Sequence, residues 1–196
     1  GIISGPLQLT LSTGATVYAD QIQINSSSSG FSMELSGGTL FLQSQINFAS
    51  GTSQARRLVL SSDISLLSSV KLSPMGVSDS LELAGKLMGS NTVTKDGAGL
   101  LVLSGLNQMT GDLRIAGGTV NLNSDSAVGT GAVQIVVGSS GAVVLGNSSG
   151  ADVALSTNNK IDLNTDFTYA SANNLNLGAG SVTLGGSSAS SARTIT

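Results

Sequence analysis

Residues 162–166, Asp-Leu-Asn-Thr-Asp, have the residue types and the spacing of a calcium-binding loop. Such loops take oxygen ligands from alternate positions, here Asp162, Asn164 and Asp166, followed by a Gly at a sharp turn and a final Glu. Phe167 stands in the Gly position, and the final Glu is missing. Polar side chains that alternate along the outer face of a strand explain the segment equally well. We therefore predict no metal site, and Asp162, Asn164 and Asp166 are the calcium candidates to test.

Four carboxylates could meet across neighbouring turns of a repetitive fold, as the paired acids of a glycosidase do: Asp63, Asp79, Glu82 and Asp96. Because only 11 acidic residues are spread along the 196 residues, we do not expect such convergence. The Arg56-Arg57 pair could supply the base of a polysaccharide lyase that uses carboxylate-bound calcium, but a surface turn is the default interpretation. We predict no catalytic residue and no enzyme activity.

The chain has neither His nor Cys, which removes imidazole bases, thiol nucleophiles, disulfides and the usual ligands of zinc, haem and iron–sulfur clusters. Ser is abundant, but the G-x-S-x-G turn of a serine hydrolase does not occur. The Gly pairs at 97–99 and 129–131 lack the third Gly and the helix that bind phosphate, so we expect no cofactor. A Ser–Lys dyad needs a desolvated Lys, whereas we expect solvated surface positions for Lys71, Lys86, Lys95 and Lys160.

Charge and hydropathy exclude two further classes of partner. Eight Lys and Arg residues against 11 Asp and Glu, for a net charge of −3, provide no basic surface for a nucleic acid. No apolar run approaches the ~20 residues of a spanning helix, so we expect no membrane span.

The aromatic residues are too dispersed along the sequence for a sugar-stacking platform, and we expect the Phe residues to fill the core. The aromatic residues are Tyr18, Phe31, Phe41, Phe48, Phe167 and Tyr169.

The elements that must position these residues are short β-strands. Apolar residues recur at every second position in short bursts, which Gly, Ser and Asn separate. This spacing places apolar side chains on one side of a strand and polar side chains on the other. No window has sustained helical spacing, so we expect almost no helix. The residues predicted to point inward are Leu101, Leu103, Leu113, Ile115, Val120, Leu122, Val133 and Ile135.

The sequence also repeats itself in part. The segment 36–42, Ser-Gly-Gly-Thr-Leu-Phe-Leu, returns at 116–122 as Ala-Gly-Gly-Thr-Val-Asn-Leu. Leu-Glu-Leu-Ala-Gly at 81–85 returns at 101–105 as Leu-Val-Leu-Ser-Gly. Self-similarity of this kind is typical of units that bury their apolar faces by stacking on one another. The spacing between copies is irregular, so we predict a degenerate solenoid rather than a strict array.

Within residues 94–129 the chain reads T-K-D-G-A-G-L-L-V-L-S-G-L-N-Q-M-T-G-D-L-R-I-A-G-G-T-V from Thr94 onward. This stretch resembles the autotransporter-associated β-strand repeat, whose pattern is approximately K-x-G-x-G-x-L-x-L-S-G-x-N-x-Y-x-G-x-T-x-I-x-x-G-T-L. Met109 stands where the family usually has Tyr, and Asp112 lies where it prefers Gly or Thr. The resemblance covers about a fifth of the chain. It implies a right-handed parallel β-helix in an exported protein, extracellular or on a bacterial cell surface.

The residues give that architecture a physical rationale. A coil of three short strands places Leu, Val and Ile inside, with Gly or Asn at corners that need a positive φ. Each coil hydrogen-bonds to the next at ~4.8 Å, and about 20 to 27 residues per coil would give about seven to ten coils. Asn107 is expected at such a corner, stacked on counterparts in adjoining coils.

We therefore expect residues 1–196 to form a single β-solenoid segment of a longer chain, with a possible repeat-unit boundary near 105–111. The expected function is structural or adhesive, as a surface rod or an extracellular fibre or matrix. The alternative is a carbohydrate-active β-helix, either a polysaccharide lyase or a glycan-binding module. An ice-binding solenoid would need regular Thr ladders, and the Thr residues are not in register.

The expected partners are further copies or repeats of the chain itself, placed end to end or side by side. Natural β-proteins protect open strand edges with Pro, charge or a capping element. The stretch 182–195 offers only Arg193, and Pro6 and Pro74 are the only prolines. Host or matrix glycans are the second expected class of partner.

Overall fold

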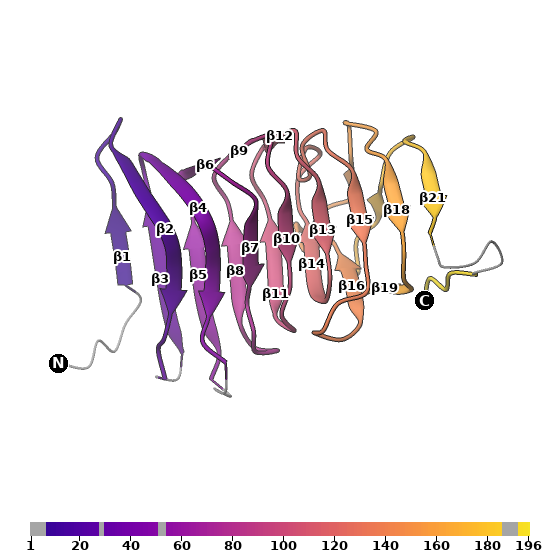
Figure 1. Cartoon of the computed structure of the whole chain (residues 1–196), viewed down its shortest axis with the longest axis horizontal. Coiled ribbons are helices and arrows are strands. Elements are labelled where there is room, and N and C mark those ends of the chain that lie inside the picture. The colour runs from indigo at the N-terminus through magenta and orange to yellow at the C-terminus, as the bar shows by residue number, and fades with distance from the viewer. Residues whose placement is uncertain (1–6, 28–29, 51–53, 186–191) are drawn as a thin grey trace.

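The computed structural model describes residues 7–27, 30–50, 54–185 and 192–196, and these contain β-strands and no α-helix. The strands are stacked along the long axis of a rod, with the first strand, β1 (Leu7–Thr10), and the last, β21 (Val182–Leu184), toward opposite ends (Figure 1). Neighbouring strands pair in parallel, and each pairs with strands from the preceding and following turns of the chain. The predicted parallel β-solenoid is confirmed.

One sheet has eight strands, one from each turn, and we call it face 1. Its order follows the chain, so each turn adds one strand to the growing edge. The strands are β1 (Leu7–Thr10), β3 (Phe31–Ser36), β5 (Arg56–Leu60), β8 (Ser80–Leu83), β11 (Leu100–Leu103), β14 (Gly118–Leu122), β16 (Val143–Gly146) and β19 (Phe167–Tyr169).

A second sheet supplies the other two faces of the rod. Its two long strands, β2 (Thr16–Ile24) and β4 (Thr39–Phe48), pair along their length. The first part of β4 pairs with β6 and its last part with β7, so the sheet divides there into two ladders. Face 2 continues through β6 (Asp63–Leu66), β9 (Leu87–Gly89) and β12 (Gln108–Met109). Face 3 continues through β7 (Val70–Ser73), β10 (Val93–Lys95), β13 (Leu113–Ile115), β15 (Val133–Ile135), β18 (Ile161–Leu163) and β21 (Val182–Leu184).

Two short strands, β17 (Val153–Ala154) and β20 (Leu175–Asn176), pair with each other between faces 1 and 3 of the last turns. The predicted three strands per coil therefore hold from β5 onward, except in the turn from β14 to β15. The coils differ in length. The first coil runs from Leu9 to its partner Leu35, and a shorter coil runs from Leu103 to its partner Leu122. The eight strands of face 1 correspond to eight coils, which lie within the predicted range.

The core consists of ladders in which one apolar side chain per coil stacks on the next. Leu81 pairs with Leu101, and Leu101 pairs with Val120. All eight residues predicted to point inward are at most 1% exposed, so that prediction is confirmed. Burying each such side chain contributes roughly 1.5–3 kcal/mol, and the stacked coils share this stabilisation because none has a core of its own.

Close approach between coils explains the glycines of the 94–120 motif. A Cβ on Gly105 would collide with the backbone oxygen of Gly85 in the preceding coil. Gly97 has φ of +86°, a conformation that other residues rarely adopt. The motif therefore requires Gly at these positions for backbone reasons.

Candidate functional site

Arg56 and Asp79 form an ion pair inside the rod, with both side chains fully buried. The guanidinium Nε donates to Asp79 Oδ1 at 2.8 Å, and Nη2 donates to Oδ2 at 2.7 Å. Further bonds run from Nη1 to the Ile24 oxygen at 3.3 Å and from Nη2 to the Ala49 oxygen at 2.8 Å. The cation also lies 5.5 Å from the centre of the Phe48 ring. The predicted surface turn is therefore wrong: Arg56 begins a buried strand because its planar donors match a carboxylate from the next coil.

Lys95 also occupies a buried position, in register between Leu72 and Ile115 on face 3. Its Nζ donates to the backbone oxygens of Asp96, Gly97 and Gly117, at 3.2, 2.7 and 3.0 Å. Burial lowers the pKa of Lys95 to about 8, although the nearby charge of Asp96 opposes this shift. The predicted solvated position is wrong for Lys95, because corner carbonyls of two coils replace the water around the ammonium. The three contacts engage all three ammonium protons, so this Lys does not have the free amine of a Ser–Lys dyad.

Asn107 is buried at the corner that follows face 1. Its Oδ1 accepts a hydrogen bond from the Leu87 backbone N–H at 2.8 Å, and its Nδ2 donates to the Ala127 oxygen at 2.6 Å. The contacts reach the coil before and the coil after. The expected stack on Asn counterparts does not form, because the partners are backbone groups rather than amide side chains.

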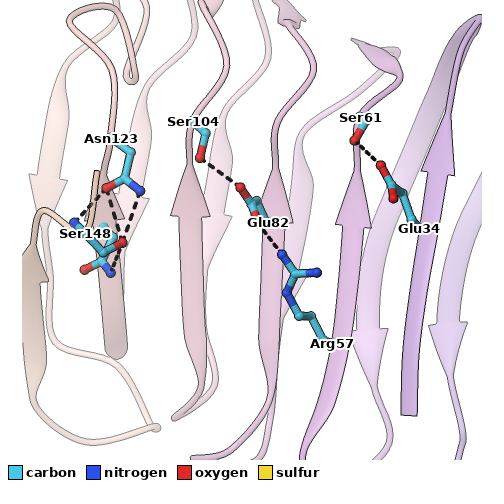
Figure 2. Close-up of polar contacts among 8 residues, drawn as sticks. Glu34, Arg57, Ser61, Glu82, Ser104, Asn123 and Ser148 are labelled. Atoms are coloured by element: carbon cyan, nitrogen blue, oxygen red, sulfur yellow. Dashed lines mark hydrogen bonds and ion pairs between the residues drawn. The ribbon is translucent and has the colours of Figure 1, made fainter. Parts of the chain in front are cut away.

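The outward side of face 1 carries three hydrogen-bonded groups of polar side chains, one after another along the rod, which together we call the polar row. In Figure 2 the Ser61 hydroxyl donates to Glu34 at 2.8 Å. Glu82 accepts from Arg57 at 2.7 Å and from Ser104 at 3.1 Å, so one carboxylate joins three neighbouring coils (Figure 2). The row comprises Glu34, Arg57, Ser61, Glu82, Ser104, Asn121, Asn123 and Ser148.

The row continues on the later coils through amides and a hydroxyl. Asn121 and Asn123 donate through Nδ2 to the Ser148 hydroxyl, at 2.9 and 3.1 Å. The Ser148 N–H donates to Asn123 at 2.9 Å, and Figure 2 shows this pair. These groups offer donors and acceptors on the outside of a sheet. Such a surface suits many weak contacts with a large partner rather than the activation of a small substrate.

The four carboxylates considered for a glycosidase have separate partners. Asp79 binds Arg56, and Glu82 belongs to the polar row. Asp63 accepts a hydrogen bond from the Lys86 backbone N–H at 2.9 Å. Asp96 forms an ion pair with Lys71 at 2.8 Å and accepts from the Ser140 hydroxyl at 2.5 Å and from the Gly97 N–H at 2.8 Å. They do not form an acid pair.

Asp96 has a shifted pKa. Partial burial raises it, but hydrogen bonds from Lys71, Ser140 and the Gly97 N–H, together with the Lys71 charge, outweigh burial and lower it to about 2. This carboxylate is therefore held in its ionised form at neutral pH, where it links coils at the corner between faces 3 and 1.

The calcium candidates lie at the C-terminal end of the rod. Asp162 points outward on β18 and pairs with Lys160 at 2.8 Å. Asp166 accepts a hydrogen bond from the Thr194 backbone N–H at 2.9 Å, and Asn164 lies in the corner between them. Within the described ranges, no group of three or more Asp, Glu, His or Cys side chains is placed to hold a metal ion. The same described residues contain no helix long and apolar enough to span a membrane.

Two aromatic residues that are distant in sequence stack on the outside of face 2. The ring centres of Tyr18 and Phe41 are 4.7 Å apart, and their planes differ by 16°. The sequence-based conclusion that the aromatic residues are dispersed is wrong for this pair, because β2 and β4 align the two residues in register. Phe48 and Phe167 fill the core as predicted, whereas Phe31 and Phe41 are only half-buried.

Comparison with known proteins identifies a partial homologue. The chain is 33% identical over 114 residues to the adhesin BmaC autotransporter of Brucella suis biovar 1 (strain 1330). The match covers 58% of this chain and about 3% of the length of that relative. No family model matches the chain, and no solved structure matches it. The partial homology and the β-solenoid agree with the resemblance to an autotransporter passenger-type β-helix.

Proposed function

We propose that this chain is an adhesive and structural segment of an exported bacterial surface protein. The observation that carries the proposal is the eight-coil parallel ladder, which holds the polar row on one outward sheet face. A rod of this kind presents many weak contact points at regular spacing, as a surface that adheres to a large partner must. The homology to a protein named as an autotransporter adhesin supports the same role and an extracellular or cell-surface location.

The chain would act as a single segment of a longer solenoid. At the first coil, Leu9 occupies an inward position but is 50% exposed, and at the last coil Leu184 is 60% exposed. Ile195 already pairs with Phe167 and so begins the next strand of face 1. We propose that further coils cover both ends, from the same protein or from another copy, and build a rod or a fibre. The repeat-unit boundary near 105–111 stays a prediction.

An enzyme is the less favoured interpretation. The base that a lyase would need is not provided by Arg56, because its guanidinium is fully buried and already bonded to Asp79 and two carbonyls. A glycan-binding role is the second candidate, and the stacked Tyr18 and Phe41 rings favour it.

Adherence of chain-coated beads to cultured epithelial cells tests the adhesive role. We expect more beads to adhere than albumin-coated beads do, and fewer after Glu82→Gln, which removes a charge from the polar row. Asp162→Asn is the matched control, because Asp162 also belongs to an exposed ion pair but lies on face 3. Adherence no better than that of albumin-coated beads would refute the proposal.

A further inference from the structure

Face 2 carries a second outward row, which includes the stacked rings and which we call the aromatic row. It consists of in-register residues from successive coils: Tyr18, Phe41, Ser65, Met88 and Gln108. These residues are exposed or half-buried, and those beside them in the strands point into the core. Ser65 is the smallest member of the row, and it is the next residue of the row after Phe41, on the neighbouring strand β6.

The two faces of the Phe41 ring therefore have different neighbours. Strands β2 and β6 pair with opposite edges of β4, so Tyr18 covers one ring face and Ser65 lies toward the other. The next large side chain on that side is Met88, two strand spacings away, or about 9.6 Å. A flat six-membered ring could stack above Ser65 on Phe41, as Tyr18 does at 4.7 Å on the other side.

Polar groups that, among the described residues, still have a free donor or acceptor border this position. The described residues provide no hydrogen bond to the Ser65 hydroxyl or to the side-chain amide of Gln43, which is exposed two residues beyond Phe41. Asp63, two residues before Ser65, accepts one bond through Oδ1 from the Lys86 N–H and keeps Oδ2 for another donor. An aromatic face flanked by a hydroxyl, an amide and a carboxylate matches a sugar, which has an apolar C–H face and a rim of hydroxyls.

We propose that Phe41 stacks on one pyranose ring of an uncharged glycan, whose hydroxyls bond to Ser65, Gln43 and Asp63. The weakly positive C–H groups of the sugar would face the negative face of the aromatic ring. The carboxylates of Asp20 and Asp63 outnumber the single ammonium of Lys86 along this side, so an acidic sugar is disfavoured. The inference rests on the proposed adhesive role only for its biological setting, since the sugar contact is measured separately from adherence.

Saturation-transfer NMR with lactose at millimolar concentration tests the proposal, with 3′-sialyllactose as the acidic probe. We expect transfer from the chain to the C–H protons of lactose and weaker transfer to sialyllactose. Phe41→Ala should weaken lactose binding about tenfold, because loss of one stacked ring corresponds to roughly that factor. Ser65→Phe should abolish it by filling the position with a third ring, while the outward location of residue 65 leaves the core intact. Leu100→Ala, a half-buried outward residue on face 1, is the matched control and should bind like the native chain.

Two results would overturn the inference. One is the absence of transfer from the native chain to lactose. The other is equal transfer from the native chain, Phe41→Ala and Ser65→Phe, with circular dichroism showing all three folded. Either result would leave the bead-adherence result unaffected, so failure of the sugar contact is distinguishable from failure of the adhesive role.

Discussion

Lys95→Met tests how the buried ammonium contributes to stability. In the native chain, Nζ donates to three backbone oxygens at 2.7–3.2 Å, and the side chain has no exposed surface. Met has a similar length but no donor, so the substitution leaves the oxygens of Asp96, Gly97 and Gly117 without this partner. Each buried polar group left unpaired costs about 1–3 kcal/mol.

The opposing effect is the cost of burying a charge. A pKa of about 8 in place of the ordinary 10.5 corresponds to about 3 kcal/mol by which folding disfavours the ammonium. Met removes that cost and adds apolar burial. At pH 7 we therefore expect a net loss of about 2 kcal/mol in the free energy of unfolding, because three orphaned oxygens outweigh the relieved charge.

The pH dependence gives the sharper result. Between pH 8 and 10.5 the unfolded chain keeps its Lys95 proton and the folded chain loses it, so the unfolded state binds more protons. The free energy of unfolding of the native chain should therefore rise with pH over this window, by about 3 kcal/mol relative to Lys95→Met. Urea unfolding followed by circular dichroism at pH 7, 9 and 10.5 measures both chains, and the contributions of the other Lys and Tyr residues cancel in the difference. Parallel pH profiles for the two proteins would refute this account of Lys95.

Three further perturbations concern other contacts between coils. Asp79→Asn should lower the free energy of unfolding by about 3–5 kcal/mol, because it leaves a buried guanidinium without its counter-charge. Glu82→Gln, in an exposed pair, should lower it by about 1 kcal/mol or less, so similar urea midpoints for the two variants would contradict this expectation. Asn107→Ala should cost about 2–4 kcal/mol and speed amide exchange at Leu87, whose N–H loses its acceptor; unchanged exchange would refute the contact. As the pH falls from about 4 to about 2, the window set by the lowered pKa of Asp96, the native chain should lose stability and Asp96→Asn should lose less. Acid unfolding curves of the variant that coincide with those of the native chain would exclude this contribution of Asp96.

Local alternation predicted the strands and the core correctly. The pair Leu101 and Leu103 points inward because a strand has a period of two residues, a property that the neighbouring residues alone determine. The motif around Gly97 and Gly105 likewise predicted corners, since those positions need Gly for backbone reasons. The absence of sustained helical spacing correctly indicated an all-β chain, and the repeats indicated stacked coils.

The partners of charged side chains could not be predicted in this way. Arg56 appeared suited to a surface turn because its carboxylate, Asp79, lies 23 residues later and reaches it only through the next coil. Lys95 appeared solvated because one of the carbonyls that replace its water belongs to Gly117, 22 residues away. In both cases burial depends on groups that become neighbours only after the coils have stacked.

The outward rows depended on the same tertiary alignment. The number of residues between equivalent positions in successive coils varies, and it is larger from Leu9 to Leu35 than from Leu103 to Leu122. No fixed period in the sequence therefore shows which residues of successive coils lie side by side in a row. Tyr18 and Phe41 stack because parallel pairing of β2 and β4 brings them into register. The sequence alone determined which side of each strand faces the core, because that depends on alternation between adjacent residues. Only the tertiary structure decided which polar and aromatic side chains meet on the surface, because that depends on the length of every corner between coils.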